Sequence, residues 1–459
     1  MGTRLEALQL DDGLLVGIDV GTSFCKAAVV TADGRELAHG KVRTPWRIVA
    51  SGAEIEPDAL VRVSIEAAEA ALAQVGGRMD GRVVGVGVTS MAETGVLLAS
   101  DGRPVTASIA WHDGRAEEEG KRLGAAVGED RFVATAGLPV SRLCSAAKYS
   151  WMRAHLPGTS AGVRWLNVAE WVVRELGGEA AAEFSLASRT GWLDRARRRI
   201  WAEALDASGA PGSLLPDLVP AGTPLGTVTR GPAALLGAAV TVAGHDHVCA
   251  SVGAGALGTG DVFNSCGTAE AYVRAVDAPI LGAAATRAVS GGVAAGCHVV
   301  PGKDALMGGF TSGLILDRWL RALGVEEADR DALDEAALAL SDHDGAPLAE
   351  PVLQRADPTA LPAERSPAHA WRSVLETLAH RGRSVLTTIE GVSGPSPGLV
   401  VTGGVARGRA FRTIKGRLVA PFVLASVEEA GARGAALLGG CAAGLYSDVT
   451  AVPTPSWGN

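Results

Sequence analysis

The sequence predicts an α/β protein built from two similar domains. Its 459 residues exceed what one hydrophobic core comfortably holds, so two domains are expected. Sixty glycines and only 4% aromatic residues fit a fold with many tight turns between strands and helices. Two apolar hairpin patterns, each broken by a glycine and a threonine, occur 246 residues apart at Gly21 and Gly267. This spacing, just over half the chain, indicates two similar domains that face each other across a cleft.

The bulk composition limits the classes of partner. The net charge of −8 and the pI near 5.7 argue against nucleic acid or an anionic membrane surface as the main partner. No uncharged run reaches the roughly 20 residues that a membrane helix needs. The start of the chain has no apolar signal-peptide core, so we expect a cytoplasmic protein. Six cysteines without a CxxC pair are expected to be buried thiols.

The first glycine turn lies between two apolar runs within residues 14–30, and the stretch 14–42 predicts a three-stranded meander. Glycine leaves room for a bulky anion, and the hydroxyl and N–H groups of Gly21, Thr22 and Ser23 could bind phosphate oxygens. Asp19, at the end of the incoming strand, could hold a metal ion against that phosphate. The alternative is an ordinary hairpin with a solvated Asp19.

The remaining elements follow from apolar periodicity. Strands are predicted at residues 82–90 and 235–243, because these runs are short, apolar and rich in valine, and residues 399–406 run a further buried strand into paired glycines. Stretches with apolar residues at helical spacing predict helices at residues 57–76, 116–126, 145–155, 167–177, 248–257, 306–323, 367–389 and 428–443. The basic run at residues 194–199 is expected to be a solvated helix face.

Polar residues follow two of the predicted strands in the first half. Ala92 and Glu93 come just after residues 82–90, at the strand end where open α/β sheets bind ligands. Glu93 is therefore a candidate acceptor for a substrate hydroxyl, or else a solvated loop carboxylate. Asp113 could likewise meet a sugar hydroxyl, or simply pair with Arg115.

Asp246 is the candidate catalytic residue. It stands at a strand-to-helix turn about twenty residues ahead of the second glycine hairpin. A carboxylate beside a transferring phosphoryl group can take the proton from an attacking hydroxyl. The alternative is that Asp246 only caps the following helix. His245 and His247 flank it, but no further cysteine or carboxylate cluster is near enough to complete a zinc site.

The second half repeats the glycine-rich pattern. Gly267 and Thr268 form the second turn, and Gly309 lies in a further glycine pair. Gly403 and Gly404 follow a buried strand, where glycines can let a flat nucleobase or ribose rest against the backbone.

Taken in order, these motifs resemble the FGGY family of carbohydrate kinases, within the actin–hexokinase–Hsp70 superfamily. The segments that carry the resemblance are GIDVGTSFCKA, TSMAETGVLL, IAWHDGRAEEE, AGLPVSRLCSAAKYSWM, FSLASRTGWLD, GHDH, CGTAE and VVTGGVARG. The resemblance implies two ribonuclease H-like domains of the actin/hexokinase type around an interdomain cleft. Residues 12–242 would form the N-terminal sugar-side domain, and residues 243–450 the C-terminal ATP-side domain.

The resemblance also implies roles for individual residues. It implies that a small sugar or polyol is phosphorylated with ATP and Mg2+, with Asp246 as the general base and Asp19 positioning the metal. The implied ATP-binding residues are Gly21, Thr22, Ser23, Lys26, Gly267, Thr268, Gly309, Gly403 and Gly404. The implied substrate-side residues are Ala92, Glu93, Trp111, Asp113 and Asp246. A homodimer is among the expected assemblies.

The chain departs from the family pattern at several positions. Ala92 and Glu93 stand where glycerol kinases carry an Arg-Glu pair and xylulose kinases a Met-His pair, so the acceptor stays open between a ketose such as a pentulose and a polyol or cyclitol. Ala269 replaces the usual serine after the second Gly-Thr, and Phe411 lies near the place of a tryptophan in the adenosine motif. A substrate-regulated nucleotide switch and a degenerate kinase of the same fold are the alternatives.

Overall fold

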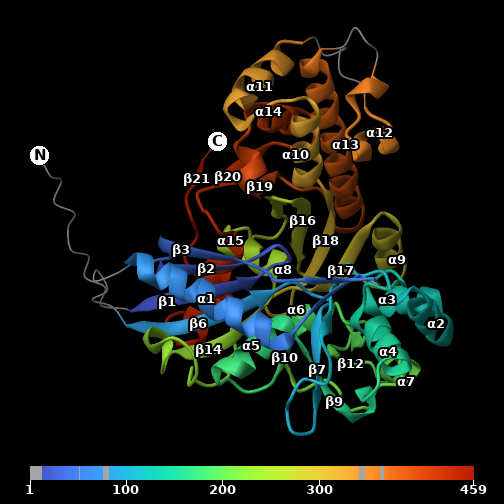
Figure 1. Ribbon diagram of the computed structural model, residues 1–459, viewed down its shortest axis with the longest axis vertical. Coiled ribbons are helices and arrows are strands. Elements are labelled where there is room, and N and C mark those ends of the chain that lie inside the picture. The colour runs from blue at the N-terminus through green and yellow to red at the C-terminus, as the bar shows by residue number, and fades with distance from the viewer. Residues whose placement is uncertain (1–12, 51, 76–81, 341–346, 362–365, 459) are drawn as a thin grey trace, which may run out of the picture. The chain divides into compact units, whose positions relative to one another are not determined.

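The computed structural model describes residues 13–50, 52–75, 82–340, 347–361 and 366–458, which fold into two compact units (Figure 1). The described part of the first unit runs from residue 13 to Gly255 and takes in Gly296–Lys303 and Glu429–Pro455. The second comprises Ala256–Ala295, Asp304–Glu428 and the residues from Ser456. The proposed domain division at residues 242 and 243 stays a prediction.

The central sheet of the first unit has the strand order β14-β6-β1-β2-β3. Strands β1 (Leu14–Val20), β2 (Phe24–Thr31) and β3 (Glu36–Arg43) form the expected antiparallel meander. Strands β6 (Val83–Ser90) and β14 (Ala239–His245) continue the sheet parallel to β1. The carboxyl ends of β1, β6 and β14 therefore meet at one edge, where ligands bind in open α/β sheets.

Alternation along β1 decides which helix packs on which face of this sheet. Val16 and Ile18 belong to a core that includes Leu60 and Val63 of helix α1 (Pro57–Val75). On the other face, a Cβ at Gly17 would collide with the backbone of helix α15 (Ala430–Ala442). Glycine at this position therefore lets a helix backbone lie directly against the strand.

The second unit repeats the same strand order. Its sheet runs β18-β16-β15-β19-β20, with β17 (Val293–Cys297) and β21 (Trp457–Gly458) at the two edges. Strands β15 (Val262–Cys266), β16 (Ala269–Val276) and β18 (Asp304–Thr311) form an antiparallel meander. Strands β19 (Leu399–Thr402) and β20 (Phe422–Ala425) continue parallel to β15. The two units thus share one topology, which confirms the predicted α/β fold of two similar halves.

The other elements surround these sheets. In the first unit they are β4 (Arg47–Val49), β5 (Gly52–Ile55), β7 (Gly95–Ala99), β8 (Ser108–Ile109), α2 (Glu117–Val127), α3 (Glu129–Ala136), α4 (Ser145–His155), β9 (Gly162–Asn167), α5 (Val168–Leu176), β10 (Ala182–Glu183), α6 (Phe184–Ala187), β11 (Leu193–Asp194), β12 (Arg199–Ile200), α7 (Ala202–Ala207), β13 (Leu218–Val219) and α8 (Asp246–Gly253). In the second they are α9 (Gly282–Ser290), α10 (Gly313–Ala322), α11 (Arg330–Ala339), α12 (Glu350–Arg355), α13 (Pro367–Ser393) and α14 (Arg409–Leu418).

One predicted helix begins later than expected, and another is wrong. The stretch 306–323 begins inside strand β18, and only its second part forms helix α10. The basic run 194–199 is the turn of the hairpin β11–β12, where Arg198 has a positive φ of 47° that a helix does not allow. Among the described residues, no helix combines the length and apolar character needed to cross a membrane.

Candidate active site

Two carboxylates of the first unit lie at the carboxyl edge of its sheet. Asp19 is the next-to-last residue of β1, and Asp246 is the first residue of α8, directly after β14. Strand β6 lies between β1 and β14, so the topology places both carboxylates at the same edge. His245, rather than Asp246, occupies the cap position of α8.

Burial raises the pKa of both groups. Burial, with the nearby Asp246 charge, raises the pKa of Asp19 from 3.8 to about 7. Burial also raises the pKa of Asp246 above its usual 3.8, although His247 opposes this shift. The Oδ1 atom of Asp246 accepts a hydrogen bond from the His247 backbone N–H at 2.6 Å and lies 3.2 Å from Nε2 of His245. Asp246 is thus a more basic carboxylate than one in water.

Asp19 has the features of a carboxylate that can hold a magnesium ion. Its Oδ1 is buried and has no hydrogen-bond partner among the described residues. Within that same part of the chain, no group of three or more His, Cys, Asp or Glu side chains could hold a metal ion by itself. Magnesium commonly binds through one or two carboxylates together with phosphate oxygens and water. The donor set therefore fits a metal that arrives with a phosphate ligand.

Lys26, predicted to contact ATP, lies beside Asp19. The two residues are paired in register on β1 and β2. The Lys26 Nζ is 2.5 Å from Oε2 of Glu429, just before α15, and Glu429 raises the pKa of Lys26 despite its burial. Lys26 is therefore a charged group at this edge of the sheet.

The first glycine turn is held by two indole groups. The Trp46 Nε1 donates to the Thr22 carbonyl oxygen at 2.6 Å, and the Trp111 Nε1 donates to the Thr22 Oγ1 at 2.8 Å. Trp111, predicted to contact the acceptor, is thus in direct contact with the predicted phosphate turn. Ser23 is exposed in the same turn.

Glu93 follows β6 and pairs with a residue that the sequence argument did not single out. Its carboxylate Oε1 lies 2.6 Å from Nε and 2.5 Å from Nη2 of Arg189, just after α6. Glu93 is largely buried and Ala92 is 2% exposed. The quoted segment FSLASRTGWLD contains Arg189, but nothing in the linear sequence joins it to a residue 96 positions earlier.

Asp113 shows the pairing that was the alternative to a substrate contact. Its Oδ1 accepts from Nε of Arg115 at 2.9 Å, and its Oδ2 accepts from the Ala53 N–H at 2.7 Å and from Nη2 of Arg115 at 2.8 Å. Its side chain is fully shielded from solvent. Direct contact of Asp113 with a substrate stays a prediction.

A chain of hydrogen bonds that ends at a buried carboxyl group supports the turn that carries Asp246. The Ser185 Oγ accepts from the His245 N–H at 2.9 Å and donates to Oε2 of Glu183 at 2.5 Å. Gly244 has φ 93°, and a Cβ there would lie 2.6 Å from the Ser185 Oγ. The turn therefore requires glycine at position 244, with Ser185 and Glu183 packed against it.

In the second unit, the glycines predicted for nucleotide binding gather around the second turn. The Gly313 N–H donates to the Gly267 carbonyl at 3.2 Å, and the Leu314 N–H donates to the Thr268 carbonyl at 3.3 Å. A Cβ at Gly403, which has φ 103°, would collide with the Cys266 carbonyl. Gly403 therefore packs directly against the residue that precedes this turn.

Gly309 and Gly404 differ in their surroundings. A Cβ at Gly309 would lie 2.5 Å from the Glu270 carbonyl, within the pairing of β16 and β18. A Cβ at Gly404 would meet nothing within 4 Å, so the backbone there faces open space. An open glycine next to a turn leaves room for a flat ligand against the backbone.

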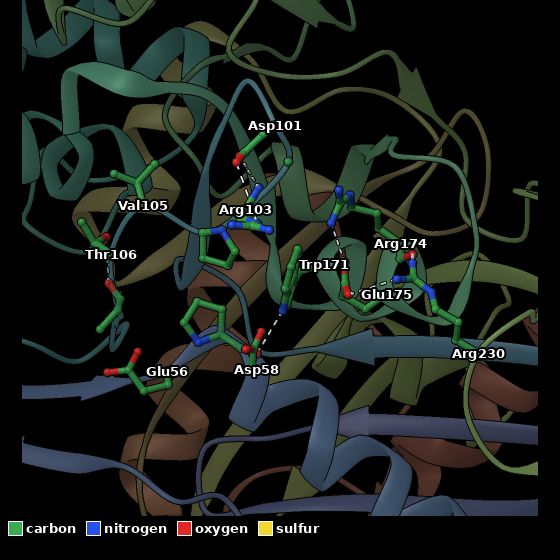
Figure 2. Close-up of a pocket in the computed structure, with 14 residues that line it drawn as sticks. Glu56, Asp58, Asp101, Arg103, Val105, Thr106, Trp171, Arg174, Glu175 and Arg230 are labelled. Atoms are coloured by element: carbon green, nitrogen blue, oxygen red, sulfur yellow. Dashed lines mark hydrogen bonds and ion pairs between the residues drawn. The ribbon is translucent and has the colours of Figure 1, made fainter. Parts of the chain in front are cut away.

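A separate pocket of about 760 Å³ in the first unit contains none of the predicted site residues (Figure 2). It lies over the start of α1, residues 101–107 and the end of α5. Three of its charged groups pair with one another: Arg174 contacts Glu175, and Arg230 lies 3.5 Å from the same carboxylate. Figure 2 shows these three side chains together beside Trp171.

Known proteins share both the sequence pattern and the fold. A glycerol kinase from Aromatoleum aromaticum is 29% identical over 466 residues, covering 95% of this chain and 91% of its own. The crystal structure of a xylulose kinase from Rhodospirillum rubrum is 25% identical with a TM-score of 0.84, covering 97% of this chain and 93% of its own. A gluconate kinase from Lactobacillus acidophilus, 18% identical with a TM-score of 0.84, covers 97% of this chain and 92% of its own and shares the fold.

The sequence profile of the N-terminal domain of the FGGY family of carbohydrate kinases matches residues 14–253, more than half of the chain. This match covers β1, the first glycine turn, Glu93, Arg189 and Asp246. The protein uses ATP to phosphorylate a small sugar or polyol, and the chain belongs to the FGGY family of carbohydrate kinases.

Proposed function

We propose that this kinase transfers the γ-phosphoryl group of ATP to a primary hydroxyl of a small ketose, such as a pentulose, or of a polyol, with Asp246 as the general base. One observation carries this proposal. Asp246 opens α8 at the same sheet edge as Asp19, and burial raises its pKa. A raised pKa makes the carboxylate a better proton acceptor than one in water.

The reaction is an in-line displacement. The acceptor oxygen forms a bond to the γ-phosphorus, its proton moves to a carboxylate oxygen of Asp246, and the bond from phosphorus to the bridging oxygen breaks to release ADP. Phosphoryl transfer has little covalent chemistry for the protein to perform, so positioning and charge stabilisation supply most of the acceleration. The proton that Asp246 takes is then released to water.

The glycine turns supply the phosphate contacts in this proposal. Thr22 and Ser23 of the first turn and Thr268 of the second offer N–H and hydroxyl groups to phosphate oxygens. Gly21 and Gly267 shape these turns, and their own N–H groups donate to the carbonyl oxygens of Phe24 and Ala269. Asp19 would hold Mg2+, which when bound neutralises charge on the phosphates. Lys26 adds a positive charge beside Asp19.

The adenosine and acceptor contacts complete the assignment. Gly404 borders the open space that suits the ribose or base, and Gly403 beside it packs against the Cys266 backbone. On the acceptor side, Glu93 accepts a hydrogen bond from a hydroxyl group, and the small side chain of Ala92 leaves room for an acceptor larger than glycerol. A pentulose or a linear polyol fits these requirements.

The decisive experiment compares Asp246→Asn with the wild-type enzyme in a coupled assay of ADP release over a panel of ketoses, polyols and cyclitols. We expect kcat to fall by about 10²–10⁴-fold, the range typical of a lost general base. The KM for ATP should change by less than about twofold, because Asp246 does not bind the nucleotide. The exposed Asp217→Asn serves as the control. Near-normal turnover by Asp246→Asn would overturn the assignment of the base.

A further inference from the structure

Glu93 has an unusual backbone conformation for its residue type. Its φ is 58°, and among the described residues only Arg198 and Ala356 are other non-glycine residues with positive φ. This left-handed conformation is strained for a residue with a Cβ, and it persists where surrounding contacts hold it. Such strain is concentrated at functional sites, where it aims a side chain that would otherwise point elsewhere.

The contact that holds Glu93 comes from Arg189. Two donors of the guanidinium, Nε and Nη2, converge on one carboxylate oxygen, Oε1, at 2.6 and 2.5 Å. Their side chains are only 13% and 10% exposed, so water screens this ion pair weakly. None of the described residues donates a hydrogen bond to the other oxygen, Oε2, which leaves that atom as the acceptor for a ligand.

Lys148, a second buried cation near Glu93, does not bind its carboxylate. The Nζ of Lys148 is buried and donates to the carbonyl oxygens of Leu143 at 2.6 Å and of Arg142 at 3.2 Å. Arg189 is thus the cation bonded to Glu93. It also offsets the effect of the Glu93 charge on Asp246, the proposed base. Glu93 raises the pKa of Asp246, and Arg189 lowers it.

The geometry points to Arg189 as a positioning residue that fixes the strained Glu93 carboxylate so that its Oε2 accepts a hydroxyl of the sugar or polyol. This inference rests on the proposed function, because Glu93 is the acceptor contact in that proposal. In this inference Arg189 acts through Glu93 and not by direct contact with the acceptor or the nucleotide. Its loss should therefore weaken acceptor binding and orientation and leave ATP binding almost unchanged.

A kinetic test uses Arg189→Met, Arg189→Lys, Glu93→Gln and the double variant Arg189→Met with Glu93→Gln. The acceptors are glycerol, xylulose, ribulose and ribitol, and the most active one is carried forward. We expect Arg189→Met to raise the acceptor KM tenfold or more and to change the KM for ATP by less than twofold. Arg189→Lys should recover part of the loss, and the double variant should be little worse than either single one.

A generic loss of a buried ion pair needs a matched control. Arg372→Met breaks the pair between Arg372 and Glu376 in α13, whose Nε–Oε1 distance is 2.9 Å and whose side chains are even more shielded, at 4% and 7% exposed. It should alter stability and leave the acceptor KM unchanged. If Arg189→Met only lowers stability, as this control does, or if its effect multiplies with that of Glu93→Gln, the positioning role is refuted.

A second readout needs no acceptor at all. Hydrogen exchange of the peptide over residues 90–96 should be faster in Arg189→Met than in the wild type, because the strained turn loses its ion pair with Arg189. Residues 247–253 in α8 should exchange at the wild-type rate. Unchanged exchange at residues 90–96 would overturn the inference by itself. If Asp246→Asn loses turnover while Arg189→Met behaves like the wild type, the proposed function holds and the positioning role of Arg189 is refuted.

Discussion

Glu183 is a buried carboxyl group that is linked through Ser185 to the turn that carries the proposed base. Its Oε2 accepts from the Ser185 Oγ and from the Leu186 N–H at 3.0 Å, whereas its Oε1 has no partner among the described residues. Burial raises its pKa from 4.5 to about 7. The folded protein therefore holds this proton at pH values where the unfolded chain has already released it.

This shift predicts a pH-dependent stability. Because the folded pKa is raised, the contribution of Glu183 is fully present below pH 4.5 and is lost as the pH rises through about 7. Glu183→Gln cannot ionise, and its amide can keep both accepted hydrogen bonds. We expect this variant to be more stable than the wild type at pH 8 by about 1–3 kcal/mol, with a much smaller difference at pH 5. Urea unfolding at pH 5, 6, 7 and 8 measures it.

A control separates burial from simple loss of charge. Glu66→Gln removes a carboxylate whose side chain is 47% exposed, so its unfolding free energy should follow the wild-type pH profile. If Glu183→Gln keeps the same slope between pH 5 and 8 as the wild type, Glu183 is not a buried neutral acid. Glu170, whose pKa burial also raises to about 7, should preserve part of the slope in every variant.

The sequence locates some of these residues and misses others for a physical reason. Glu93 and Asp246 could be proposed because each directly follows an apolar run that predicts a buried strand, and strand ends carry ligand sites. The importance of Arg189 and Glu183 arises from contacts across 60 or more residues, to Glu93 and through Ser185 to His245. Such contacts leave no local pattern.

At the level of elements, apolar periodicity located several helices to within two residues. Helix α4 spans Ser145–His155 as predicted, and α1 and α5 agree within one or two residues. It failed at residues 306–311, where Gly308 packs closely against Val385 of α13 and the segment is a strand inside the sheet. Tertiary packing overrode the apolar spacing there.

The packing of α15 on β1 yields a second stability prediction. A Cβ at Gly17 would collide with the Ala432 carbonyl and approach the Ala436 backbone N–H, and neither backbone atom can rotate away. Gly17→Ala should therefore lower the free energy of unfolding by about 1–3 kcal/mol or more. Gly212→Ala, where a Cβ would meet nothing within 4 Å, should change it by less than about 0.5 kcal/mol. Equal urea midpoints for the two variants would contradict this account.

For the whole molecule, the two glycine hairpins correctly indicated a repeated architecture. Both sheets place a three-stranded meander beside two parallel strands in the same order. A linear reading could not show that α15, near the end of the sequence, packs against β1, near its start, within one unit. This contact joins residues more than 400 positions apart and depends on the surface that α15 presents to the sheet. Local helix propensity does not encode that surface.

Nucleotide binding should be visible in the stability of the entire chain. A ligand that binds only the folded state at 100 times its Kd stabilises it by about 2.7 kcal/mol, so Mg2+ with ADP should raise the Tm of the wild type. Gly403→Ala forces a Cβ against the Cys266 carbonyl beside the second turn, and at the same ADP concentration its Tm rise should be less than half as large. Gly404→Ala meets no protein atom within 4 Å, so its Tm without nucleotide should match the wild type, and any loss would appear only with ADP. A full nucleotide-induced rise in Gly403→Ala would show that the second turn does not bind the phosphates.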